Sequence, residues 1–300
     1  MQHAAARIAG GLILFLALTC ILGACGGRGI FAPPHIAGYQ LDTELPQGLP
    51  DQAPIYRVVE SPTPVADWAR QVAAALGFEG EPVDYSEAAA QPEWTWAGPR
   101  SDQSLEVFGN VAFAGTPLDR DTGAGPPETA EAAVAAARAW LTARDLLPAD
   151  CADDAQAWAY RGGWEVCFRR HLDGLPVGVG RRWDGRGGIC LTLDTRGYVD
   201  GILYVHREVE ADRFVPIKDV EAAWQELQRR GPAFFDFEGP TFPEYGIFTV
   251  TEVALGYFEG PVGTAEVQKQ FKPHYIFIGR AEISNEDGEV RAAAYVPAWK

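Results

Sequence analysis

The stretch "WEVCFRRHLDGLPV", residues 164–177, holds two short alternating segments on either side of the pair Asp173-Gly174. In the first segment, large apolar side chains such as Trp164 and Phe168 alternate with polar ones, which is the period of a β-strand. Aspartate and glycine both tolerate a positive φ, so the pair predicts a tight turn. The stretch therefore predicts a β-hairpin.

The same pattern extends along the chain on both sides of this hairpin. Gly162-Gly163 and Arg196-Gly197 mark further turns between alternating segments, of which "CLTLDTRGYVDGI" at residues 190–202 is one. Each break contains a glycine that can take positive φ. An antiparallel meander of strands is the simplest interpretation.

A helix is predicted immediately before these strands. Residues 125–148, "GPPETAEAAVAAARAWLTARDLLP", have Pro127 near the start and Pro148 after the end, as helix start and stop signals require. The same order, a helix-period segment followed by alternating segments, recurs from residues 61–78 and from residues 215–231. The sequence thus predicts an α+β fold of tandem modules, each of one helix packed on a short antiparallel β-sheet.

These signals divide the chain into five parts. We expect residues 1–25 to be a lipoprotein signal peptide and residues 26–53, which are rich in glycine and proline, to be a flexible tether. The three helix-plus-sheet modules then occupy residues 54–120, 121–212 and 213–300.

The leader, residues 1–25, has Arg7 as its one charged side chain, followed by an apolar core. That is the layout of a secretory signal. The run "LGACG" at residues 22–26 resembles the bacterial lipobox, so we expect a lipid on Cys25 rather than on Cys20. The alternative is a single-pass N-terminal anchor. Both predict a body on the extracytoplasmic face of the bacterial cell membrane.

The charge balance limits the partners of this body. The chain has 41 acidic and 25 basic side chains, giving a formal charge of −16. Such a surface repels phosphate backbones, so we expect no nucleic-acid binding, and it favours cationic partners.

Three cysteines, Cys151, Cys167 and Cys190, lie in the body. Outside the cytoplasm we expect two of the three to form a disulfide, with the pairing left open. No CxxC or histidine-spaced cluster is present, and we expect no cofactor.

Two weaker chemical candidates exist. In "HREVEAD", a strand would place His206, Glu208 and Glu210 on one face, where they could hold a metal ion; we favour the alternative that they cover the solvent side of a strand end. Cys167 lies near His171 and could be a reactive thiol, but a disulfide or an inert buried cysteine is the favoured interpretation.

Tryptophans supply a further binding hypothesis, because an exposed aromatic row could stack on sugar rings or pack on a peptide. The candidates in predicted sheet regions are Trp94, Trp96, Trp158, Trp164 and Trp183. Alternation favours a core position for most of them.

The second module, with its alanine-rich helix and the two hairpins quoted above, is similar to PepSY-type modules of secreted bacterial proteins. The end of the chain, from "ALGYFEGP" at residues 254–261 to "AAAYVPAW" at residues 292–299, resembles the YycH and YycI regulatory proteins. The resemblance covers residues 125–300 and implies an extracytoplasmic protein that restrains a sensor histidine kinase controlling cell-wall metabolism.

From these observations we expect a non-enzymatic, lipid-anchored extracytoplasmic protein that binds an envelope protein or peptide in a regulatory role. The rival is a secreted hydrolase whose site is assembled from residues distant in the sequence. A third hypothesis is an envelope polysaccharide-binding protein that uses the tryptophans.

Overall fold

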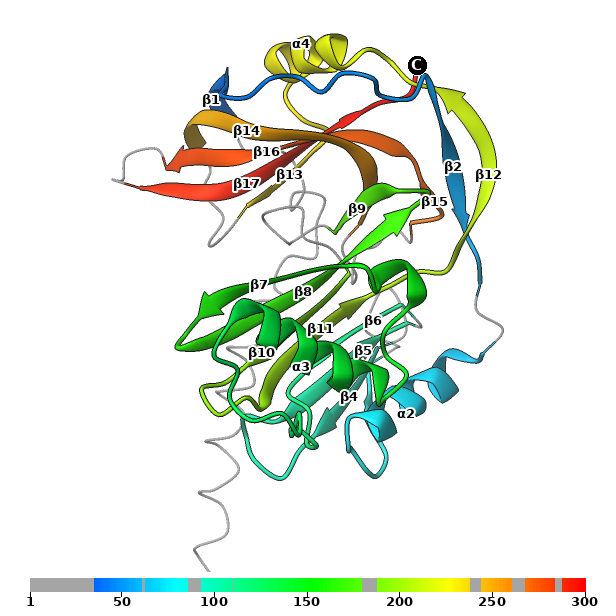
Figure 1. The fold of residues 1–300 in the computed structure, drawn as a ribbon. Helices are drawn as coiled ribbons and strands as arrows, with labels where there is room; N and C mark the ends of the chain where they lie inside the picture. Colours follow the sequence, from blue (N-terminus) through cyan, green and yellow to red (C-terminus); the bar gives the residue numbers. More distant parts are fainter. Residues whose placement is uncertain are drawn as a thin grey trace, which may run out of the picture.

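A computed structural model describes residues 35–60, 63–85, 93–109, 111–179, 188–237, 244–260, 268–283 and 288–300 (Figure 1). The predicted signal peptide with Cys20 and Cys25, the start of the predicted tether and Trp183 lie outside the described residues. No helix in these ranges has the length and apolar composition needed to cross a membrane.

The α-helices lie where the sequence predicted them, and the described ranges contain α2 (Val65–Ala75), α3 (Ala130–Thr142) and α4 (Val220–Arg230). The hydroxyl of Thr129 accepts a hydrogen bond from the backbone N–H of Ala132 at 3.2 Å and caps α3. Asp219 caps α4 in the same way, and Gly231, with φ +73°, ends it. The positions of the three helices are therefore confirmed.

Most of the remaining chain is strand, and most strands belong to one large mixed sheet. Its order is β13 (Phe234–Phe237), β17 (Glu289–Pro297), β16 (Pro273–Ile283), β14 (Glu244–Glu259), β9 (Leu175–Val179), β8 (Gly163–Leu172), β10 (Ile189–Leu193), β11 (Val199–Val205), β6 (Ala112–Gly115), β5 (Ser104–Phe108), β4 (Glu93–Ala97) and β3 (Val83–Asp84). In addition, β1 (His35–Leu41) pairs with β14 and β7 (Asp154–Tyr160) pairs with β8.

A second, smaller sheet has the order β12 (Val209–Pro216), β2 (Gln52–Val58) and β15 (Gln270–Phe271). Within the range predicted as a tether, β1 pairs in parallel with β14, and β2, which pairs with β12 and β15, begins at the end of that range with Gln52. The described part of that range is thus built into the C-terminal half of the molecule, because its alternating apolar residues find strand partners more than 150 residues away in the chain.

The predicted fold class is wrong. The structure is mostly β-sheet, and the helices do not each cover a small sheet of their own. The cores explain why: Val72 of α2 and Trp140 of α3 belong to one apolar cluster with Phe168 and Leu191 from the shared sheet. Trp224 of α4 belongs to a separate cluster in the C-terminal half. Two predicted modules have therefore merged over one sheet face.

The hairpin of residues 164–177 joins the two halves. Asp173 and Gly174 have φ values of 50° and 79°, as a tight turn requires, and Leu172 pairs with Leu175. After the turn, β9 pairs in parallel with the end of β14, where Val177 lies opposite Tyr257. The predicted hairpin is confirmed, but the sequence did not predict that it connects two distant parts of one sheet.

A disulfide joins Cys167 of β8 to Cys190 of β10, which lie directly opposite each other in the strand pairing with 4.1 Å between their Cα atoms. The bond resolves the open pairing, and it excludes a free thiol at Cys167. Cys151 is the remaining cysteine of the described ranges; its thiol is free and buried.

Candidate functional site: a polar cluster at the junction of the sheet halves

Charged side chains gather where the two halves of the large sheet meet. Arg170 comes from β8, Glu259 from the end of β14, and Arg207 from the link between β11 and β12. Their relative exposures are 1%, 0% and 3%, respectively, although charged residues are seldom fully buried without partners. The halves therefore meet around buried charge rather than around apolar side chains alone.

Glu259 neutralises both guanidinium groups. Arg207 donates from Nη1 to Oε1 of Glu259 at 3.0 Å and to the carbonyl oxygen of Gly260 at 3.1 Å. Arg170 places Nη1 at 3.7 Å from Oε2 of the same carboxylate. Because a buried charge is costly without an opposite charge, the contacts between these groups offset part of the cost of removing them from water.

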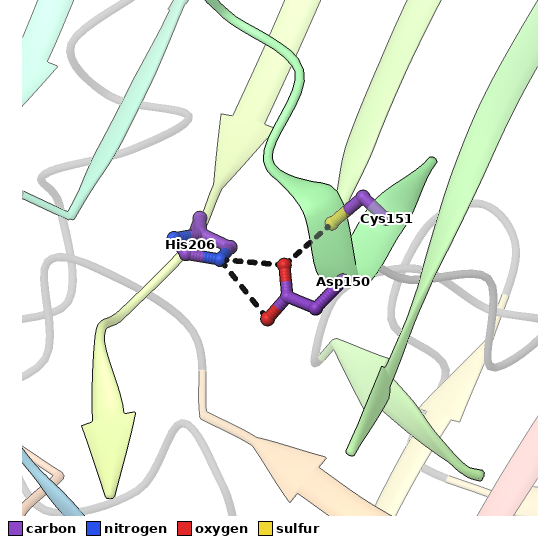
Figure 2. Close-up of side chains that lie close together, drawn as sticks. All are labelled: Asp150, Cys151 and His206. Atoms are coloured by element: carbon purple, nitrogen blue, oxygen red, sulfur yellow. Dashed lines mark hydrogen bonds and ion pairs between the residues drawn. The ribbon is translucent and has the colours of Figure 1, made fainter. Parts of the chain in front are cut away.

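A second carboxylate, Asp150, lies beside this group, on the short 3-10 helix η1 (Ala149–Cys151). Arg170 donates from Nε to Oδ2 of Asp150 at 2.7 Å. On the other side, Nε2 of His206 lies 3.0 Å from Oδ1, and Sγ of Cys151 lies 3.7 Å from the same oxygen. Figure 2 shows the carboxylate of Asp150 between the imidazole and the thiol.

The surroundings shift the pKa values of Asp150 and Cys151 in opposite directions. Burial acts to raise the pKa of Asp150, but the hydrogen bond with His206 and the charge of Arg170 outweigh it and hold the pKa well below its usual range. Burial raises the pKa of the Cys151 thiol, and the negative charge of Asp150 raises it further. The carboxylate is therefore ionised and the thiol protonated at neutral pH.

This order of groups does not favour nucleophilic catalysis. A cysteine nucleophile needs a base within reach of its thiol, with an acid orienting that base. Here Asp150 lies between Cys151 and His206, and the thiol is fully buried. Two surface hollows of the described part, one beside Arg144 and one beside Pro127, do not include these residues.

The structure does not bring His206 together with Glu208 and Glu210. His206 lies in the link between β11 and β12, outside any strand, so the expected alternation does not apply. Glu208 is exposed, and Glu210 forms an ion pair with Arg57 of β2. Instead His206 meets Asp150, 56 residues earlier in the chain, and no local sequence pattern connects the two.

The described tryptophans do not form an exposed row. Trp94 and Trp96 are 8% and 3% exposed and pack in the core beneath α2. Trp158 and Trp164 are half-buried, and the indole N–H of Trp164 donates to the carbonyl oxygen of Pro127 at 3.0 Å. This arrangement gives no support to stacking on a sugar chain.

Strand β12 is the most exposed strand of comparable length among those described. It is the outer strand of the small sheet and arches along the outside of the molecule (Figure 1). Five consecutive residues of β12, from Glu210 to Phe214, are exposed. The relative exposure of Phe214 is 64%. No other exposed large apolar residue of the described part reaches this value.

Comparisons with known proteins assign the chain to no family. No family model matches it, and no curated protein matches it. Among solved structures, it is similar to an uncharacterized protein from Eubacterium rectale ATCC 33656, with 10% sequence identity and a TM-score of 0.48, over 88% of this chain and 89% of the other.

Proposed function

We propose that this protein is a non-enzymatic, lipid-anchored extracytoplasmic protein that binds an extended segment of another envelope protein along the open edge of β12, in a regulatory role. The observation that carries the proposal is the exposed outer strand with Phe214 on it. The Cys167–Cys190 disulfide supports an oxidising compartment, and the lipobox-like run ending in Cys25 supports anchoring there.

An open strand edge is a binding surface because its outward N–H and C=O groups lack partners. An extended peptide can add to such an edge as a further strand, gaining backbone hydrogen bonds and specificity from alternate side chains. Edges that are not used are usually protected by charge, bulges or proline. β12 has such features, including Asp212 at a bulge and Pro216 at its end, but Phe214 between them is an exposed apolar anchor.

The charges around this edge indicate the chemistry of the partner. Glu208, Glu210 and Asp212 are acidic and exposed or partly exposed, and Arg213 is the one basic side chain of β12. Together with the overall charge of −16, they favour a segment with basic side chains and one apolar residue that contacts Phe214. The resemblance to YycI makes a sensor histidine kinase the first partner to test.

The test uses a photo-crosslinking amino acid at position 214 of the full chain in its native membrane. The matched control carries the crosslinker at Ile247, which is 39% exposed but lies on β14, a strand paired on both sides. We expect one envelope protein to be captured from position 214 and not from position 247. The variant Phe214→Ser should weaken capture of that protein by an antibody to the chain.

Equal capture from both positions would mean that exposure rather than the strand edge determines contact, and it would refute the proposed surface. Loss of the partner in Cys25→Ala, with the variant still folded and secreted, would show that anchoring is required. Capture from position 214 in Cys25→Ala at the wild-type level would refute the role of the anchor.

A further inference from the structure

We infer that Asp150, Cys151 and His206 form a binding site for Zn²⁺, with a solvent molecule or anion as the fourth ligand. The site lies outside β12, and its test requires no assumption about the proposed function. Each of the three residues offers one ligand atom, and the three atoms lie within 4.8 Å of one another (Figure 2).

Two of the three distances between the ligand atoms are close to those of a tetrahedral ion. Zinc binds nitrogen and oxygen at about 2.0 to 2.1 Å and thiolate sulfur at about 2.3 Å, which places tetrahedral ligands about 3.3 to 3.5 Å apart. Oδ1 of Asp150 lies 3.0 Å from Nε2 of His206 and 3.7 Å from Sγ of Cys151. The two distances to Oδ1 change by only a few tenths of an ångström on the ion, whereas Nε2 of His206 and Sγ of Cys151, which lie within 4.8 Å of each other, close by up to about 1.3 Å.

The types of ligand select zinc over the common hard cations. Imidazole nitrogen and thiolate sulfur are ligands for zinc and other borderline or soft ions, whereas Mg²⁺ and Ca²⁺ prefer all-oxygen sites. Cys151 is available for this role, because the disulfide occupies the other two cysteines of the described part. Three protein ligands plus an open position is a known arrangement for zinc.

Neighbouring groups orient the carboxylate. Arg170 donates from Nε to Oδ2 of Asp150 at 2.7 Å, which leaves Oδ1 directed towards His206 and Cys151. The guanidinium is itself fixed by Glu259 and lies with Cζ 5.5 Å from the ring centre of Phe271. Such partners behind the ligands hold a metal site in shape.

The charges and protons of the binding step balance. Without the ion, Asp150 and Glu259 offset Arg170 and Arg207. When Zn²⁺ binds, the Cys151 thiol loses its proton to solvent and forms the Zn–S bond, and Nε2 of His206 binds the ion through its lone pair. The net gain is one positive charge, which an anion or hydroxide at the fourth position neutralises. The side chains of Asp150 and His206 are 29% and 14% exposed, so solvent can reach that position.

The ion would connect two segments that lie far apart in the sequence. Asp150 and Cys151 lie on η1, which precedes β7, while His206 lies where the chain leaves β11 for the small sheet. One zinc ion would therefore fix the link that carries β12, and we expect bound zinc to stabilise the folded protein.

The test is a titration of the full chain, purified in detergent and freed of metal with a chelator. We expect one equivalent of Zn²⁺ to bind with release of one proton, measured by calorimetry in buffers of different ionisation enthalpy. Co²⁺ should give a thiolate-to-cobalt charge-transfer band, and Zn²⁺ should raise the melting temperature.

The variants are Cys151→Ser, Asp150→Asn and His206→Gln, with Asp153→Asn as the matched control, an exposed acid two residues from Cys151. The cobalt band should disappear in Cys151→Ser, because the disulfide holds Cys167 and Cys190. His206→Gln should weaken zinc binding by more than the roughly 10- to 100-fold that loss of an outer partner costs. The control should bind as the wild type does.

Absence of stoichiometric zinc binding in the wild type would overturn the inference. So would a cobalt complex without the thiolate band, or equal affinities for His206→Gln and Asp153→Asn. If Cys151→Ser does not fold, the wild-type cobalt spectrum and the His206→Gln affinity still decide the outcome.

Discussion

Replacement of Glu259 by glutamine tests the role of buried charge at the junction. The substitution keeps the shape of the side chain and its ability to accept a hydrogen bond from Arg207, but it removes the negative charge. Arg170 and Arg207, at 1% and 3% exposure, would then lose the carboxylate that both contact. No cavity is created, so the effect reports electrostatics rather than packing.

Breaking a buried ion pair by removing one partner costs about 3 to 5 kcal/mol. Glu259 is fully buried and serves two guanidinium groups, so we expect a loss of stability near the upper end of this range. The free energy of unfolding is measured by urea denaturation, followed by circular dichroism. The control Glu252→Gln, an exposed carboxylate on the same strand, should change it by less than about 0.5 kcal/mol.

A double-mutant cycle measures the coupling between Glu259 and Arg207. If Glu259 acts by neutralising Arg207, then Arg207→Gln combined with Glu259→Gln should cost less than the sum of the single changes, with a coupling of about 0.5 to 3 kcal/mol. A loss in Glu259→Gln no larger than in Glu252→Gln, or additive effects in the cycle, would refute the view that the halves depend on this charge group.

Three further predictions concern the frame around the site. Removal of the disulfide in Cys167→Ala/Cys190→Ala, whose partners have a sequence separation of 23, should lower the free energy of unfolding by about 3.4 kcal/mol in the loop-entropy treatment, and equal urea midpoints would contradict this. Burial acts to raise the pKa of Asp150, yet hydrogen bonding and neighbouring charge outweigh it and lower that pKa. Asp150 therefore contributes stability at pH values above the unfolded carboxyl pKa of about 3.9, and this contribution is lost as the pH falls below that value. Acid titrations of Asp150→Asn should lack this part of the loss. Gly279→Ala would place a Cβ atom 2.0 Å from a backbone oxygen of β14 and should cost about 1 to 3 kcal/mol or more, whereas Gly38→Ala, with its nearest contact at 3.9 Å, should be tolerated in thermal melts.

The sequence by itself determined the local elements. Helix signals such as Thr129 before α3 and Gly231 after α4 act within one or two turns, so they can be read without knowing the rest of the chain. The turn at Asp173-Gly174 is equally local, because it depends on which residues accept positive φ. Alternation also indicated correctly that Trp94 and Trp96 face a core.

Tertiary structure alone decided which strands pair and which polar groups meet. Strand alternation defines a face but not a partner, and β1 and β2 pair with strands that come much later in the chain, so a sheet of merged modules could not be foreseen. The site has the same origin: Asp150 meets His206 because the strands between them return the chain to one place. Short-range preferences fix local geometry, whereas long-range contacts depend on the packing of the whole chain.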